Sequence, residues 1–188
     1  VEWEASEFEV SYAIEYALWW DWDIQHLYEL EHVWSFVDQN GRLIGVDASW
    51  HGFYLPIAKS EGLETETSHP VLYVQAGKHA MVANSKGFDL MTEDVIRDAS
   101  VDAGKYGLLV SHLFQHHLKK TEIVDSLIGR YLQKRAFVPS FEYTKRLEIT
   151  SEKLVPWSTL RDWIPLRIEW WLNLLHSELD SKPSSMIG

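Results

Sequence analysis

The hydrophobic positions in the first half of the chain follow strand-like patterns. Residues 8–22 are rich in aromatic and aliphatic side chains without a helical stripe, and residues 31–38 alternate between polar and apolar positions. Further short apolar runs occur at residues 43–50, 70–74 and 107–114. Runs of this length, separated by polar segments, predict an antiparallel sheet.

One turn in this region is marked by its sequence. Asn40-Gly41 lies between two of the strand-like runs, and this dipeptide is the strongest short hairpin signal. The hairpin should return the chain antiparallel to itself and place His51 beside Glu31. Farther along, Gly77 permits a second tight bend just before His79.

The second half of the chain changes to helical spacing. Residues 121–132 carry apolar side chains three and four apart, with Thr121 as a plausible N-cap, and a second helical pattern begins at Pro156. Pro165 should kink this second segment or start a new helix. Residues 84–106 are acidic and irregular, and we expect no regular structure there.

These patterns together predict an α+β fold, an antiparallel β-sandwich core with helices added in the C-terminal half. The length of 188 residues and mass of 21.9 kDa fit one domain over residues 1–188. Within it, residues 1–118 are expected to be mainly β and to hold the site. Residues 119–188 should form a mainly helical extension.

Composition narrows the classes of function. A net charge of −11 argues against nucleic acid, because binding to phosphates requires a basic surface. The chain has no cysteine, which removes thiol nucleophiles, zinc–thiolate sites and disulfides. No apolar run reaches the roughly 18 residues of a membrane span, and no charged-then-apolar leader follows Val1. We therefore expect a soluble protein without a transmembrane segment, and the compartment and oligomeric state stay open.

The densest group of chemically active side chains lies in residues 21–32. Four carboxylates and two imidazoles fall within these twelve residues. Carboxylate oxygens and imidazole nitrogens at this density suit a divalent cation such as Ca²⁺, Mg²⁺, Mn²⁺ or Zn²⁺. On an extended segment Glu29 and Glu31 point to the same side, and His26 can fold back to join them. The predicted metal ligands are Asp21, Asp23, His26, Glu29 and Glu31. The alternative is a loop of solvated charges.

His51 and His79 each follow a strand-like run and are the predicted catalytic candidates. Either could be a ligand, a general base or a turn residue bonded to the backbone. Lys78 could stabilise an anionic substrate, or be an exposed lysine of the turn. The pair His112 and His116 has helical spacing but lacks the glutamate of a zinc-protease motif, so we interpret it as structural.

Three motifs in the first half of the chain occur in a distinctive order. They are His26, Glu29 and Glu31; then Ser49, His51 and Gly52; then Pro70, Tyr73, Gly77, His79 and Ala80. In this order they resemble the superfamily of necrosis-inducing (NPP-type) cytolysin-like proteins and related vacuolar-sorting-type proteins, with Glu29 where those have Asp and Leu30 where they have Trp. The helical second half has no counterpart in this resemblance.

The resemblance implies a β-sandwich that holds Ca²⁺ or Mg²⁺ in the acidic-His loop. In the cytolysins that cation is tied to recognition of sphingolipid head groups. Lytic activity does not carry over, because the chain shows no secretion signal and lacks the cysteines of many cytolysins.

Three classes of function follow. In the first, the protein binds a small molecule, such as a sugar or lipid head group, through the cation, with Trp22 or Trp50 stacking on it. In the second, it is a metal-assisted hydrolase with His51 as general base and His79 or Lys78 stabilising charge. In the third, the polar cluster only fixes a loop.

Overall fold

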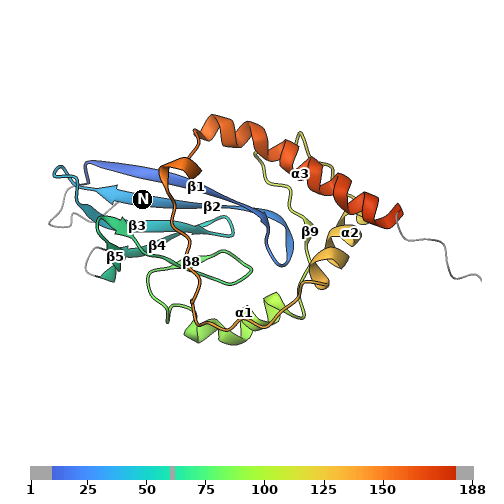
Figure 1. The fold of residues 1–188 in the computed structure, drawn as a ribbon, viewed down its shortest axis with the longest axis horizontal. Coiled ribbons are helices and arrows are strands. Elements are labelled where there is room, and N and C mark those ends of the chain that lie inside the picture. The colour runs from blue at the N-terminus through green and yellow to red at the C-terminus, as the bar shows by residue number, and fades with distance from the viewer. Residues whose placement is uncertain (1–9, 60–61, 181–188) are drawn as a thin grey trace, which may run out of the picture. The chain divides into compact units, whose positions relative to one another are not determined.

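A computed structural model describes residues 10–59 and 62–180 (Figure 1). The chain folds as two compact units, each built from separate stretches of sequence. The first unit comprises residues 1–19, 30–95 and 139–144, and the second comprises residues 20–29, 96–138 and 145–188.

The main sheet has five strands (Figure 1). Four of them follow one another in space in the order β1, β2, β3, β4, and β9 pairs in parallel with the first residues of β2. Ser11, next to β1, donates its N–H to the carbonyl of Val37 at the end of β2, so these two strands run antiparallel. The strands are β1 (Tyr12–Trp22), β2 (His26–Val37), β3 (Leu43–Trp50), β4 (Phe53–Lys59) and β9 (Gly107–Leu108).

The predicted Asn40-Gly41 hairpin is confirmed. It joins β2 to β3, and Gly41 has a φ of 78°, the left-handed region that glycine adopts without strain. The Asp38 carboxylate accepts the backbone N–H groups of Asn40 at 2.8 Å and Arg42 at 2.9 Å. The Asp38 side chain therefore stabilises the turn through two hydrogen bonds to its backbone.

A second hairpin, between β3 and β4, was not predicted. His51 and Gly52 have φ values of 48° and 84°, and they connect the paired residues Trp50 and Phe53. Two consecutive residues with positive φ between paired strands form a type I′ turn. His51 is thus a turn residue.

Two short ribbons accompany the sheet. They are formed by β5 (Thr65–Glu66) with β6 (His69–Pro70), and by β7 (Tyr73–Val74) with β8 (Met81–Val82). Met81 and the partly buried Val74 pack on Val33, Val46 and Ala48 of the sheet. The layer that faces the sheet in the first unit is therefore a two-stranded ribbon.

The helices form mostly late in the chain, and the predicted α+β class is confirmed. The prediction of no regular structure over residues 84–106 is wrong, because α1 forms there. Thr121 caps α2 as predicted, with its hydroxyl accepting the Val124 N–H at 3.2 Å. α3 continues through Pro165 as one helix. The helical elements are η2 (Asp89–Met91), α1 (Thr92–Ala99), α2 (Glu122–Gln133), η3 (Ser151–Lys153) and α3 (Trp157–Asp180).

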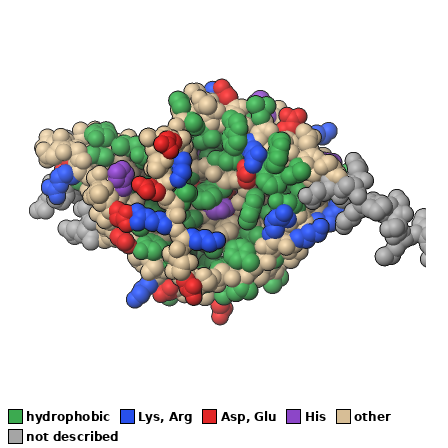
Figure 2. Space-filling view, in the orientation of Figure 1, with side chains coloured by type: hydrophobic (Ala, Val, Ile, Leu, Met, Phe, Trp, Pro, Cys, Tyr) green, Lys and Arg blue, Asp and Glu red, His purple; other side chains and the backbone are tan. Residues whose placement is uncertain are grey.

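α3 is apolar on two sides. Ile164 and Ile168 are fully buried in the second unit, and the ring of Trp171 packs edge-on against Tyr131 of α2 at 5.5 Å. Trp163 and Trp170, in contrast, are exposed, and hydrophobic side chains lie at the surface over this helix (Figure 2). Within the described residues, no helix has the length and apolar character needed to cross a membrane.

Candidate metal centre

The turn between β1 and β2 places the first two candidate ligands. β1 ends at Trp22 and β2 already begins at His26, so the expected acidic-His loop has only three residues outside the strands. The Asp23 carboxylate accepts the Gln25 N–H at 2.7 Å, and the Asp23 N–H donates to the His26 carbonyl at 3.0 Å. An aspartate that bonds to the backbone two residues on stabilises a tight turn. This turn holds Asp23 beside His26.

The backbone conformation of Tyr28 brings Glu29 to the same side of β2 as Asp23 and His26. It has a φ of 53° inside strand β2, where non-glycine residues rarely have positive φ. In a regular strand residues three apart point to opposite faces. The left-handed residue reverses this alternation, so that Glu29 comes to lie on the same side as His26.

The three ligand atoms converge. His26 Nε2 lies 3.5 Å from Glu29 Oε2 and 3.8 Å from Asp23 Oδ1. The residues Asp23, His26 and Glu29 are 0%, 6% and 5% exposed. All three belong to the second unit. We call this set the acidic-His triad.

The His26 ring is oriented for coordination. Its Nδ1 lies 2.8 Å from the carbonyl oxygen of Tyr28, and because a carbonyl can only accept, Nδ1 carries the proton. The other ring nitrogen, Nε2, is then the atom that faces the two carboxylates. A hydrogen bond from the distal ring nitrogen to a backbone carbonyl is typical of metal-binding histidines.

The triad lies wholly within the second unit, whereas His51 belongs to the first unit. Asp23, His26 and Glu29 each offer one ligand atom within 4.8 Å of the others, so the triad could hold a metal ion.

Glu31, a predicted ligand, has other partners. It is fully buried; one of its oxygens accepts the hydroxyl of Ser49 and the other accepts the backbone N–H of His51 at 2.9 Å. Ser49 Oγ in turn accepts the His32 N–H at 2.7 Å. Glu31 thus fixes the turn that carries His51, and the two residues lie close together as predicted. Glu31 is not in the group that could hold a metal ion.

Asp21 also lies outside the group. Its two oxygens accept hydrogen bonds from the Nε–H and Nη2–H groups of Arg167 on α3 at 2.8 and 2.6 Å. This two-point pair raises the pKa of Arg167 above its ordinary value, chiefly through the hydrogen bond to Asp21. Asp21 therefore attaches β1 to α3 within the second unit.

The segment 104–111 runs along the ligand-bearing residues. The N–H groups of Gly104 and Tyr106 donate to the carbonyls of Ile24 and Gln25 at 2.8 and 2.9 Å. Next, β9 pairs with His26 and Leu27, and the Ser111 N–H donates to the Tyr28 hydroxyl at 3.2 Å. We call residues 104–111 the clasp. Residues 107–114 were predicted as a strand-like run, of which only Gly107–Leu108 forms a strand, and nothing in their composition shows which strand they join.

The remaining candidates lie elsewhere. Trp22 packs on Ile24, and Trp50 packs edge-on against Phe88 at 5.9 Å, so both proposed stacking rings lie against hydrophobic clusters. Lys78 is only 5% exposed, so its interpretation as an exposed turn lysine is wrong. His79 has a φ of 67° in the β7–β8 turn and is not a member of the group that could hold a metal.

The fold and this cluster define an α+β protein with a candidate metal centre. No protein-family model, curated protein or solved structure matches the chain.

Proposed function

We propose that this protein binds a divalent cation through Asp23, His26 and Glu29. The observation that carries the proposal is the convergence of the His26 Nε2 lone pair and two carboxylates at 3.5 and 3.8 Å inside the protein. A divalent cation would coordinate all three atoms at once and balance the two buried negative charges.

The spacing of the donors narrows the choice of ion. Tetrahedral Zn²⁺ places neighbouring ligand atoms about 3.3–3.6 Å apart, and Ca²⁺ places them about 3.3–3.7 Å apart. The His26–Glu29 separation of 3.5 Å lies within both ranges and the His26–Asp23 separation of 3.8 Å slightly above them, whereas octahedral Mg²⁺ needs about 2.9 Å and would require both to shorten. The imidazole donor favours Zn²⁺ over Ca²⁺, since calcium prefers oxygen ligands. Zn²⁺ is therefore the first candidate and Ca²⁺ the second.

Three protein ligands leave coordination positions for another molecule. A bound cation would attract an oxygen-rich ligand such as a sugar or a lipid head group. Kinship with the NPP-type superfamily is a further part of the proposal. It is supported by the order of the three motifs and by His26 and Glu29 of the first motif, which lie in the triad. The hydrolase alternative stays a prediction.

The test is calorimetric titration of metal-free protein with Zn²⁺ and, separately, with Ca²⁺, combined with elemental analysis. We expect one ion per chain, and a loss of binding of tenfold or more in Asp23→Asn and in Glu29→Gln.

Asp21→Asn is the matched control, because it removes an equivalent charge two residues away without touching the triad. It should bind the ion as the wild type does. The proposal fails if no divalent cation binds, or if Asp21→Asn and Asp23→Asn weaken binding equally. Tighter binding of Ca²⁺ than of Zn²⁺ would contradict only the choice of ion.

A further inference from the structure

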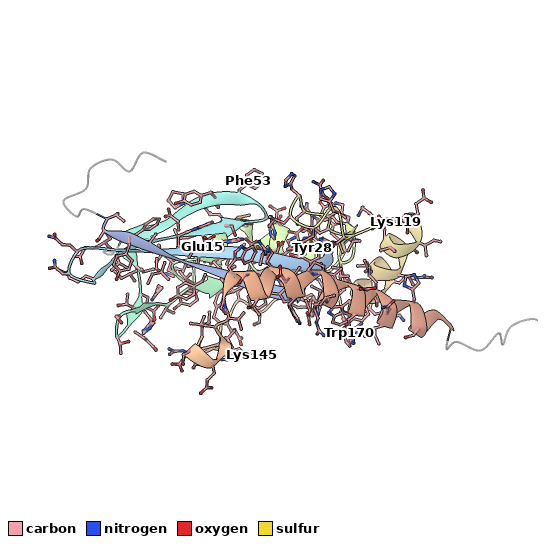
Figure 3. The ribbon with its side chains drawn as sticks, turned by 90° about the horizontal axis from the view of Figure 1, so that it is seen from above. Glu15, Tyr28, Phe53, Lys119, Lys145 and Trp170 are labelled. Carbon is pink, nitrogen blue, oxygen red and sulfur yellow. The ribbon has the colours of Figure 1, made fainter. Side chains whose placement is uncertain are left out.

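Tyr28 has an unfavourable backbone conformation, but its side chain lies in a favourable environment. A left-handed residue other than glycine costs about 1–2 kcal/mol, and aromatic residues otherwise favour extended strands. The side chain of Tyr28 is nonetheless almost completely buried and is anchored at its hydroxyl. Figure 3 marks its place on β2.

The anchor is specific to the clasp. The Tyr28 hydroxyl accepts the Ser111 N–H at 3.2 Å and lies 3.3 Å from Ser111 Oγ, to which it donates. Its ring meets Phe114 edge-on, with the ring centres 6.3 Å apart and the planes at 77°.

An extended conformation at Tyr28 would separate the residues of the triad. If Tyr28 were extended like its neighbours, His26 and Glu29 would point to opposite faces of β2. The Tyr28 carbonyl would also turn away from His26 Nδ1, to which it is bonded at 2.8 Å. One residue thus controls both the position of Glu29 and the orientation of the His26 ring.

We propose that Tyr28 is the positioning residue of the metal site, and that it makes cation binding and closure of the clasp at residues 104–111 a single coupled event. This inference rests on the proposed function. The clasp bonds to residues 24–28 through four successive contacts, so a cation that fixes His26 and Glu29 also fixes the strand to which the clasp is paired. Closure of the clasp in turn favours cation binding by the same factor.

The backbone part of the proposal is tested with Tyr28→Gly and Tyr28→Val. Both variants lose the ring and its hydroxyl, but glycine accepts the left-handed conformation and the β-branched valine opposes it. Valine fills more of the space left by tyrosine. If only packing mattered, valine would therefore be a better replacement for tyrosine than glycine.

We expect the valine variant to bind Zn²⁺ at least about tenfold more weakly than the glycine variant, a factor that corresponds to about 1.4 kcal/mol. Equal or tighter binding by the valine variant would overturn the positioning role. Wild-type protein that binds no divalent cation would instead overturn the proposed function, so the two failures are distinct.

The coupling is tested on wild-type protein by amide hydrogen exchange with and without Zn²⁺, which does not require either variant to fold. The N–H groups of Gly104, Tyr106 and Ser111 should exchange at least about tenfold more slowly when Zn²⁺ is bound. The Gly41 N–H, in the β2–β3 turn of the first unit, serves as the internal control. Clasp amides that respond no more than Gly41 would overturn the coupling.

Discussion

Folding shifts the pKa values of the Asp38 and Asp47 carboxyl groups in opposite directions. The backbone N–H of Arg42, with that of Asn40, lowers the pKa of Asp38 below its ordinary value of 3.8. Burial raises the pKa of Asp47 above the same value, against hydrogen bonds from Tyr54 and from the Ile57 backbone. The two carboxylates therefore contribute opposite slopes to the dependence of stability on pH.

The ionised carboxylate of Asp38 contributes to the stability of the folded state at neutral pH, and this contribution is lost in acid. The folded state binds the ionised form more strongly, so stability falls as the pH drops through 3.8 toward the lower pKa of the folded state. Asp38→Asn keeps an acceptor oxygen but loses the charge. We expect lower stability at neutral pH and a flatter acid profile in urea unfolding. Asp162→Asn, at a side chain that is 71% exposed, should leave both unchanged.

The Tyr54–Asp47 hydrogen bond yields a second prediction. Burial, together with the hydrogen bond to the Asp47 carboxylate, raises the pKa of Tyr54 to about 12, so the phenol remains protonated and donates to the buried Asp47. Tyr54→Phe should cost about 1–3 kcal/mol at neutral pH, because it removes a donor from a buried charged group. The loss should shrink in acid, where Asp47 becomes neutral. A loss that is equal at both pH values would contradict this account.

At the candidate site, sequence alone could identify the residues close to one another in the chain. Asp23, His26 and Glu29 were predicted and lie together. Glu31 was included because it alternates with Glu29, but its oxygens accept the Ser49 hydroxyl and the His51 N–H, partners that come from the β3–β4 hairpin. The pairing of Asp21 with Arg167, 146 residues away, depends on the tertiary fold and leaves no local signal.

Among the elements, the β3–β4 hairpin depends on one glycine. Gly52 has a φ of 84°, and a Cβ there would meet no atom within 4 Å, so a substitution is opposed by backbone conformation alone. Gly52→Ala should destabilise the protein by about 1–2 kcal/mol in urea unfolding.

Gly62→Ala is the matched control for that prediction. Its Cβ would also meet nothing within 4 Å, but its φ is not in the left-handed region. It should be neutral or slightly stabilising. Equal effects of the two substitutions would show that the turn conformation is not what matters at Gly52.

The start of α2 provides a further prediction. Thr121→Ala removes the side-chain acceptor of the Val124 N–H and should cost about 0.5–2 kcal/mol in free energy of unfolding, whereas Thr121→Ser should cost little. The measurement is again urea unfolding. If serine proved as damaging as alanine, the lost methyl group and not the cap would be the cause.

Elements with a strong local signal were predicted correctly, and short or mixed ones were missed. The Asn40-Gly41 hairpin and the Thr121 cap each follow from the chemistry of one or two residues. α1 has only eight residues in an acidic segment, and its formation depends on packing of Val95 and Ala99 into two separate hydrophobic clusters. β9 lies inside the predicted strand-like run 107–114, but only two of those residues pair with β2, and their pairing partner has no signal in the sequence.

For the whole molecule, cation binding should appear as stability. A ligand at about 100 times its Kd adds about 2.7 kcal/mol, which for a chain of this size raises the melting temperature by about 5–10 °C. Calorimetry should show this rise with Zn²⁺ and its loss with EDTA. In Asp23→Asn the melting temperature should not respond to Zn²⁺. A rise that persists in this variant would indicate binding elsewhere.

The division of the chain into two units has a consequence for how the protein can be taken apart. The boundary between the units falls inside β1, inside β2 and inside α1, and residues 139–144 belong to a different unit from the residues on either side. No single cut in the polypeptide can release either unit whole. A fragment that starts at residue 119 would lack the stretches 20–29 and 96–118 of its own unit. Neither unit can therefore be moved into another protein as one continuous segment of the chain.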